Sequence, residues 1–267
     1  MPVHVDQAPT LRLTFESPQS SPDQEDQRLP PPTRYIIPTL SSFWFKGVNK
    51  YLENLLSRID APRIYRDKFS ITFFNDIDFD TQELNQFISR TPRLGAYDEA
   101  LLIFIKSEAL VRLQSHHEPS DHGLVEVRIL CQASDWQLSS LAQICTLSLH
   151  PLLSMENLYI YEDPNSPPDW KDDIEKVEWL DLLLAFTAVK NLYPSKQFAP
   201  RIAPALQELT EGRITEVLPT LRNLFLDGFQ PSVPVREGIR QFVSARQLIN
   251  RPVAISVWER DSKNETL

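Results

Sequence analysis

A short motif recurs three times in the second half of the chain, and it constrains the fold more than any other feature. The copies are Met155-Glu-Asn-Leu-Tyr-Ile160, Val189-Lys-Asn-Leu-Tyr-Pro194 and Leu221-Arg-Asn-Leu-Phe-Leu226. Each copy reads apolar, charged, Asn, Leu, aromatic, and then apolar or Pro. The copies lie about 33 residues apart, a period typical of structural repeats. Because apolar residues alternate with residues of different character, each copy is predicted to be a short strand.

More helical stretches precede the second and third copies. They run from Trp179 to Phe186 and from Arg213 to Leu218. A repeated helix–strand unit cannot bury its apolar face alone, so it has to stack on neighbouring units. We therefore expect an α/β fold, a leucine-rich-repeat-like solenoid. It would have right-handed helix–strand repeats, a parallel sheet on its concave face and a C-terminal helical cap.

Composition excludes several classes of function. The net charge is −9 and the pI is about 5.1, whereas nucleic-acid binding requires a basic face. There are six glycines and no phosphate-binding glycine motif. We find neither an apolar run of the roughly 18–20 residues that a membrane span needs nor a secretory signal. With only two cysteines, a reducing compartment is expected, so the predicted location is cytoplasmic or nuclear.

Composition also suggests how the chain is divided. Residues 1–228 are expected to form the solenoid, with a disordered Pro- and Ser-rich loop near 17–34 and an acidic insertion near 162–178. Residues 229–267 are expected to form the C-terminal cap and tail. Within them, Pro234–Leu248 has the apolar spacing of an amphipathic helix. The residues expected to face inward on that helix are Ile239, Phe242, Val243 and Leu248.

The other elements are predicted from apolar periodicity. The expected strands are Thr10–Glu16, Pro38–Gly47, Phe69–Phe74, Ala100–Ile105, Leu124–Leu130 and an edge strand Val253–Trp258. The expected helices are Val48–Ile59, a helix that Asp80 caps and Pro92 ends, and Leu138–Ile144. Gln114–Gly123 is expected to be a polar, hairpin-like loop. Around residues 94–131 the apolar runs allow either face to point inward, so the register there stays open.

The residue types that carry chemistry do not form a recognisable active site. His116, His117, Asp121 and His122 lack the spacing of a metal site, and solvated loop histidines are the better interpretation. The carboxylates between Asp163 and Glu178 lack the spacing and the central Gly of a calcium loop, so a solvated acidic face is favoured. No nucleophile elbow is present. Cys131 and Cys145 fit buried, inert thiols. We expect no catalytic residue, no metal and no cofactor.

Strand alternation predicts a binding surface instead. Residues between the buried strand positions should point to the concave face, and there they are unusually aromatic. Aromatic side chains recur at binding hot spots because they offer a large contact area at low entropic cost. The alternative is that these rings stack on one another or are covered by loops. The candidate partner-binding residues are Trp44, Lys46, Thr72, Phe74, Tyr159, Tyr161, Tyr193 and Phe225.

Framework motifs along nearly the whole chain, from Leu11 to Trp258, resemble the leucine-rich C-terminal region of F-box-like proteins from basidiomycete fungi. The segments that carry the resemblance are Phe45-Lys-Gly-Val48, Tyr51-Leu-Glu53, Arg58-Ile-Asp-Ala-Pro62, Ile71-Thr-Phe-Phe74, Phe87-Ile-Ser-Arg-Thr-Pro92, Ser134-Asp-Trp-Gln-Leu-Ser-Ser-Leu-Ala-Gln143, Phe198-Ala-Pro-Arg-Ile-Ala-Pro-Ala-Leu-Gln-Glu-Leu209 and Glu216-Val-Leu-Pro219.

The resemblance implies an N-terminal F-box that docks on the adaptor of a cullin-type ubiquitin ligase, followed by a repeat region that binds a protein partner. The ten residues before Leu11 are too few for an F-box. We therefore expect a protein–protein interaction module that corresponds to the substrate-recognition region of such a receptor, and contact with the ligase adaptor only through an upstream F-box. The alternative is a scaffold or decoy interaction protein that recruits no ligase. No enzymatic activity is expected in either case.

Overall fold

The fold comes from a computed structural model. It describes residues 9–15, 33–64, 69–74, 81–94, 97–115, 125–131, 134–147, 149, 152, 154–170, 176–208, 214–227 and 233–258. No helix within these ranges is long and apolar enough to cross a membrane.

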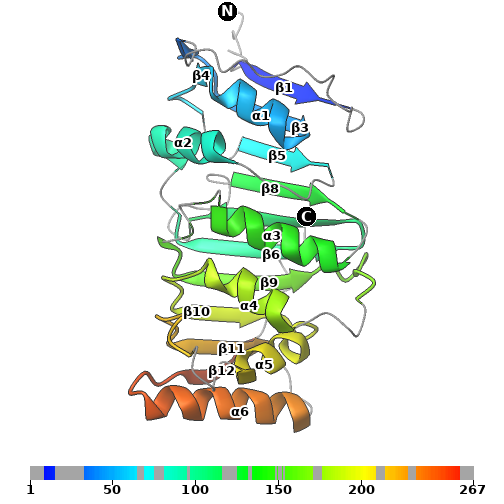
Figure 1. Ribbon diagram of the computed structural model, residues 1–267, viewed down its shortest axis with the longest axis vertical. Coiled ribbons are helices and arrows are strands. Elements are labelled where there is room, and N and C mark those ends of the chain that lie inside the picture. The colour runs from blue at the N-terminus through cyan, green and yellow to red at the C-terminus, as the bar shows by residue number, and fades with distance from the viewer. Residues whose placement is uncertain are drawn as a thin grey trace, which may run out of the picture.

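A large, mostly parallel sheet runs the length of the molecule (Figure 1). Ten strands in the described ranges belong to it, and a separate parallel pair is formed by β2 (Tyr35–Ile36) and β4 (Ile59–Asp60). In spatial order the ten strands are β1 (Thr10–Thr14), β3 (Ser42–Gly47), β5 (Phe69–Phe73), β8 (Val125–Leu130), β7 (Glu108–Gln114), β6 (Glu99–Ile105), β9 (Asn157–Glu162), β10 (Asn191–Pro194), β11 (Asn223–Asp227) and β12 (Ala254–Trp258).

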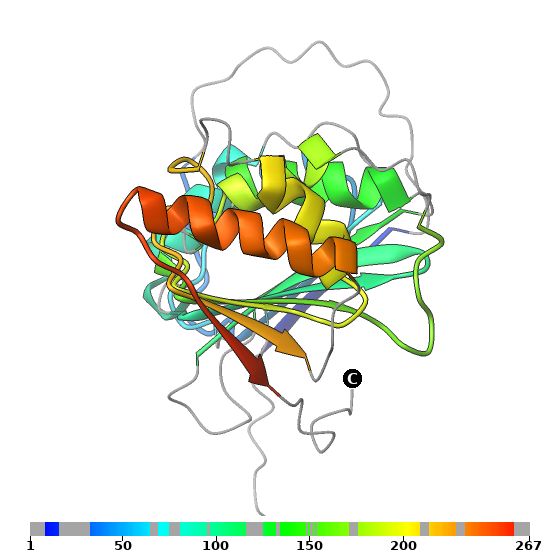
Figure 2. The ribbon, with the colours of Figure 1, turned by 90° about the horizontal axis from the view of Figure 1, so that it is seen from below.

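The helices cover one face of this sheet, which we call the helix face (Figure 2). They are α1 (Asn49–Leu56), α2 (Gln82–Arg90), α3 (Ser134–Leu147), α4 (Lys176–Leu184), α5 (Ala199–Glu208) and α6 (Val233–Leu248), together with the short 3₁₀ helix η2 (Pro92–Leu94). The opposite face carries no helix of the described ranges and is called the open face. Strand residues alternate between the two faces, as their burial shows in β5 and β11.

The core lies between the sheet and the helices. At one end, Phe43 and Phe69 stack with ring centroids 5.5 Å apart, and Phe87 of α2 lies 5.9 Å from Phe69. Farther along, Phe104 packs against Phe198 and Trp179 at 5.2 and 5.9 Å. Each buried aromatic side chain removes a large apolar area from water, and burial of that area stabilises the fold by about 25 cal/mol per Å².

The sheet departs from the expected parallel arrangement at β7. This strand pairs antiparallel with both neighbours, β6 and β8, whereas the other pairings described in this sheet are parallel. Lys106 and Ser107 alone separate β6 from β7, and so short a connection forces a hairpin. A second antiparallel connection lies where the polar, hairpin-like loop was predicted at Gln114–Gly123, because β7 ends at Gln114 and pairs antiparallel with β8, which begins at Val125. Residues 116–124 lie outside the described ranges.

Two predicted helices differ from the structure. The segment predicted as a helix at Arg213–Leu218 forms turns from Ile214 onward, and Leu218 adopts a positive φ of 46°. Pro219 disfavours a helical conformation at the preceding residue, and buried Arg246 donates to the carbonyls of Ile214 and Leu221 at 3.1 and 3.0 Å. The other predicted helix, Val48–Ile59, ends at Leu56, and Ile59 belongs to β4.

The C-terminal region forms α6 and the edge strand β12, and the strand was predicted. Ile239 and Phe242 are buried as expected and Val243 packs against the core, but Leu248 is 88% exposed, because it is the last residue of α6. The tail predicted after Trp258 lies outside the described residues. So does the loop predicted near 17–34, apart from its last two residues.

Part of the segment predicted to be an acidic insertion belongs to regular elements and to the core. β9 extends to Glu162, and α4 begins at Lys176. Trp170 lies 5.3 Å from Phe104, centroid to centroid, and its indole N–H donates to Glu162 at 3.3 Å. The segment therefore contributes an aromatic side chain that packs against the main core.

Candidate binding surface on the open face of the sheet

Strand register aligns the side chains of the open face in two rows that cross the sheet. The residue pairings across β1, β3, β5, β8, β7, β6, β9 and β10 define both rows, and ring contacts continue the first row onto β11. The first row is Arg12, Trp44, Ser70, Glu126, Arg112, Leu101, Tyr159, Tyr193 and Phe225. The second row is Thr14, Lys46, Thr72, Arg128, Leu110, Ile103 and Tyr161.

A shallow depression of about 420 Å³ occupies the end of the open face near β1. We call it the charged groove. Its lining comes from five adjacent strands, β1, β3, β5, β8 and β7. The lining residues are Arg12, Leu13, Thr14, Trp44, Phe45, Lys46, Ser70, Thr72, Glu108, Glu126, Arg128 and Leu130.

Two carboxylates of the charged groove are bound to arginines. Glu126 accepts from Arg112 at 2.9 Å and from Arg128 at 3.0 Å, and Glu108 accepts from Arg128 as well. Burial raises the pKa of Glu126, but hydrogen bonds and charges from the two arginines outweigh that effect, so its pKa lies below the ordinary value. These four side chains form a neutral, partly buried cluster across β7 and β8.

The remaining cations of the charged groove lie against aromatic rings. Arg12 lies over Trp44, with 5.5 Å from Cζ to the ring centroid, and Lys46 lies over Phe74, with 5.7 Å from Nζ. Trp44 is itself 38% exposed. Within the part of the chain that the structure describes, neither Arg12 nor Lys46 forms an ion pair. Both cations can therefore meet an incoming ligand.

Apolar side chains fill the middle of the open face. Ile103, Leu110 and Tyr161 form a small buried cluster, separate from the main core. Leu101 and Ile105 pack against it and remain partly exposed. This cluster adjoins the charged groove through Leu110, which is the neighbour of Arg128 across the β7–β8 pair.

The far end of the open face carries an aromatic stack. The ring of Tyr193 lies between those of Tyr159 and Phe225, with centroid distances of 4.3 and 4.4 Å and interplanar angles of 13° and 6°. Trp258 of β12 meets Tyr193 edge-on at 5.4 Å, and Tyr161 stacks on Tyr159 at 6.0 Å. Stacked and edge-to-face pairs each contribute about 0.5–1.5 kcal/mol beyond their area burial.

A buried carboxylate anchors the first ring of the aromatic stack. The hydroxyl of Tyr159 donates to Glu99 at 3.3 Å, and Gln114 donates to the same carboxylate at 2.8 Å. Burial of the phenol, followed by the nearby negative charge of Glu99, raises the pKa of Tyr159. Burial also raises the pKa of Tyr193. Both hydroxyls are therefore protonated at neutral pH, and Tyr159 acts as a fixed donor.

The Asn shared by the three copies of the motif explains how the rings are kept in register. Asn191 donates its side-chain amide to Asn157 at 2.7 Å, and Asn223 donates to Asn191 at 2.7 Å. We call this series the amide ladder. Backbone bonds run beside it, since the N–H groups of Asn191 and Asn223 donate to the carbonyls of Glu156 and Lys190. Each net hydrogen bond contributes on the order of 1 kcal/mol, so the ladder adds stability as well as register.

The eight residues predicted for the binding surface all lie on strands of the open face or directly after one. Trp44, Lys46 and Thr72 line the charged groove, with Phe74 beside Lys46. The other four, which are Tyr159, Tyr161, Tyr193 and Phe225, meet in the aromatic stack. The alternative considered for these rings, that they stack on one another, also describes their geometry.

Sequence reasoning included Lys46 but missed the other residues that give the open face its charge. Glu126 and Arg128 alternate with buried Val125, Val127 and Ile129 on β8, so period-two alternation of the predicted strand could have placed them. Arg12 on β1 could have been found in the same way. Trp258 could have been found only by knowing that β12 pairs with β11.

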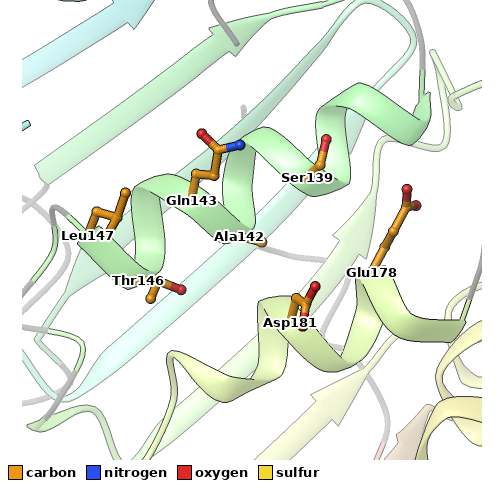
Figure 3. A pocket seen from close by; sticks show the side chains of 7 residues that line it. All are labelled: Ser139, Ala142, Gln143, Thr146, Leu147, Glu178 and Asp181. Carbon is orange, nitrogen blue, oxygen red and sulfur yellow. The ribbon is translucent and has the colours of Figure 1, made fainter. Parts of the chain in front are cut away.

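Another depression, of about 310 Å³, lies on the helix face between α3 and α4. Figure 3 shows the carboxylates of Glu178 and Asp181 on α4 together with Ser139, Gln143 and Thr146 on α3. It adjoins neither row of the open face. Cys131 and Cys145 are buried, as predicted, and burial raises the pKa of the Cys145 thiol. The predicted histidine cluster at residues 116–122 lies outside the described ranges.

Comparisons with protein-family models, curated proteins and solved structures gave no match for this chain.

Proposed function

We propose that this chain is a non-enzymatic protein-interaction module that binds a partner protein across the open face of its sheet. One observation carries the proposal: two rows of side chains cross adjacent strands, and they include the exposed ring of Trp44 and the half-buried rings of Tyr159, Tyr193 and Phe225. Rigid elements hold binding residues more precisely than loops do. Aromatic and arginine side chains dominate protein interfaces energetically.

We further propose that the helix–strand units form a leucine-rich-repeat-like solenoid. Support comes from the repeated motif, because Asn157, Asn191 and Asn223 lie in one register on adjacent strands. The resemblance to basidiomycete F-box-like proteins favours a role as the substrate-recognition region of a ubiquitin-ligase receptor. A scaffold or decoy protein would use the same surface without recruiting a ligase.

Affinity capture with point variants tests the proposed surface. The immobilised chain would be incubated with basidiomycete lysate, and the captured proteins would be identified by mass spectrometry. We expect Trp44→Ala or Phe225→Ala to remove partners that the unaltered chain captures. Tyr35→Ala is the matched control, because Tyr35 is 72% exposed but lies on the separate strand β2. Capture of the same proteins by all four chains would contradict the proposal.

A second capture separates the two roles. It uses the chain joined to the sequence that precedes it in its gene. Recovery of the ligase adaptor with this longer protein alone would support the receptor role. Recovery of a consistent partner without any adaptor would support the scaffold role.

A further inference from the structure

We propose that the charged groove binds an extended, acidic segment of the partner protein, and that Arg12 and Lys46 recognise its carboxylates. This inference rests on the proposed function, because it names the kind of segment that one end of the open face takes.

The sign of the charged groove is set by two residues. Arg112 and Arg128 are bound to Glu126 and Glu108, so these four side chains neutralise one another. Arg12 and Lys46 then leave the groove with a net positive charge, in a chain whose net charge is −9. A local reversal of sign draws negatively charged groups to that place.

Arg12 and Lys46 are also placed to bind. Each lies over an aromatic ring, Trp44 or Phe74, which holds the cation in position without using its N–H donors. A guanidinium can donate two parallel hydrogen bonds to one carboxylate, and such charge-assisted bonds are about twice as strong as neutral ones. Two carboxylates in an extended segment would therefore fit the two cations.

The extent of the charged groove suggests a peptide rather than a small acid. Its lining spans five neighbouring strands, and a strand spacing of about 4.8 Å makes the groove about 19 Å long. An extended chain covers that length with about six residues. The exposed ring of Trp44 lies beside Arg12, and the hydroxyls of Ser70 and Thr72 lie on β5, between the strands of these cations and β8. There they can contact the segment's apolar atoms and backbone.

Fluorescence anisotropy tests the inference directly. The probe is fluorescein-labelled octa-aspartate, and the matched neutral probe is an octapeptide of alternating Gly and Ser. We expect the unaltered chain to bind octa-aspartate at least about tenfold more tightly than the neutral peptide. Its affinity should fall at least about threefold between 50 and 200 mM salt, because the distance over which exposed charges interact is about 10 Å at 0.1 M and shortens as salt increases.

Charge-reversal variants locate the site. Arg12→Glu combined with Lys46→Glu should weaken binding of octa-aspartate at least about tenfold, and Arg12→Gln with Lys46→Gln should weaken it by less. Lys50→Glu is the control, because Lys50 is an exposed cation on α1 at the helix face. It should leave affinity within about twofold of the unaltered chain. Thermal midpoints of all variants would be compared to show that the fold is kept.

Three outcomes would overturn the inference. One is no preference for octa-aspartate over the neutral peptide at concentrations up to about 1 mM. Another is an equal loss of binding with Lys50→Glu, and the third is tighter binding of a labelled thymidine octanucleotide than of octa-aspartate. In each case the proposed function would still stand if Phe225→Ala alone removed captured partners, because that residue lies in the aromatic stack outside the groove.

Discussion

The charged groove and the aromatic stack lie at opposite ends of one face, but their side chains are held in different ways. In the groove, Trp44 and Lys46 each touch one neighbouring side chain through a cation–ring contact. In the stack, Tyr193 contacts rings on three other strands. At the groove end, the side chains proposed to meet a partner contribute little to the fold, whereas at the stack end the same side chains would bind a partner and support the fold.

The repeated motif explains part of this difference. β9, β10 and β11 carry the amide ladder, so their rings are brought into register and stack at about the strand spacing. The strands of the charged groove carry no copy of the motif. Their open-face residues vary from strand to strand, and ion pairs and single cation–ring contacts take the place of the stack.

The largest effect is expected from removing the central ring of the stack. Tyr193→Ala deletes two stacked contacts and one edge-on contact, so the free energy of unfolding should fall by about 2–3 kcal/mol. Tyr193→Phe keeps the ring and should stay within about 0.5 kcal/mol of the unaltered chain. Chemical denaturation would measure both changes. A change below about 0.5 kcal/mol for Tyr193→Ala would show that the stack does not support the fold.

The aromatic stack should lose stability at alkaline pH, and the charged groove should lose stability at acid pH. The pKa of Tyr159 is raised in the folded state, so its contribution to stability is complete below the ordinary value of 10.0 and is lost as pH rises above it. The pKa of Glu126 is lowered, so its contribution is complete above the ordinary value of 4.5 and is lost as pH falls below it. Thermal midpoints should therefore decrease toward both extremes.

Single substitutions test which region causes the loss of stability at each pH extreme. Tyr159→Phe should make the decrease above pH 10 less steep and leave the acid side unchanged. Glu126→Gln should do the reverse, with a lower midpoint at neutral pH because Arg112 and Arg128 lose a charged partner. If Tyr159→Phe altered the acid side instead, the assignment of the alkaline limit to the stack would be wrong.

The smallest effect on stability is expected in the charged groove. Trp44→Ala removes a half-exposed ring and its contact with Arg12, an interaction worth about 0.5–1 kcal/mol at exposed sites, so the free energy of unfolding should change by less than about 1 kcal/mol. Denaturation measured beside Tyr193→Ala provides the comparison. A loss as large as that of Tyr193→Ala would remove the distinction between the two regions.

Strand alternation predicted much of this surface from sequence. The inward and outward assignments of Phe43, Trp44 and Phe45 on β3 agree with their burial, and so do those of Leu224, Phe225 and Leu226 on β11. Alternation depends only on neighbours in sequence, so it can be read without knowing which strands pair. The eight candidate residues could therefore be placed on one face before their mutual distances were known.

Features that depend on distant pairings could not be predicted. The hairpin at Lys106 and Ser107 lacks the Asn-Gly signal of a tight turn, so the antiparallel pairing of β6 with β7 had no local marker. The start of α2 is capped from another helix, since the carboxylate of Glu53 accepts from the backbone N–H groups of Glu83 and Leu84 at 2.7 and 3.0 Å. Such contacts appear only when the chain has folded.

The amide ladder also makes the repeat a module that could be duplicated. Asn191 accepts from the next copy and donates to the previous one, so an inserted unit of the same sequence would find both partners already in place. Every added unit would lengthen the open face by one strand spacing, about 4.8 Å, and would contribute one more ring. The reach of this surface could thus change in whole steps, through gene duplication or by design, with the existing core left intact.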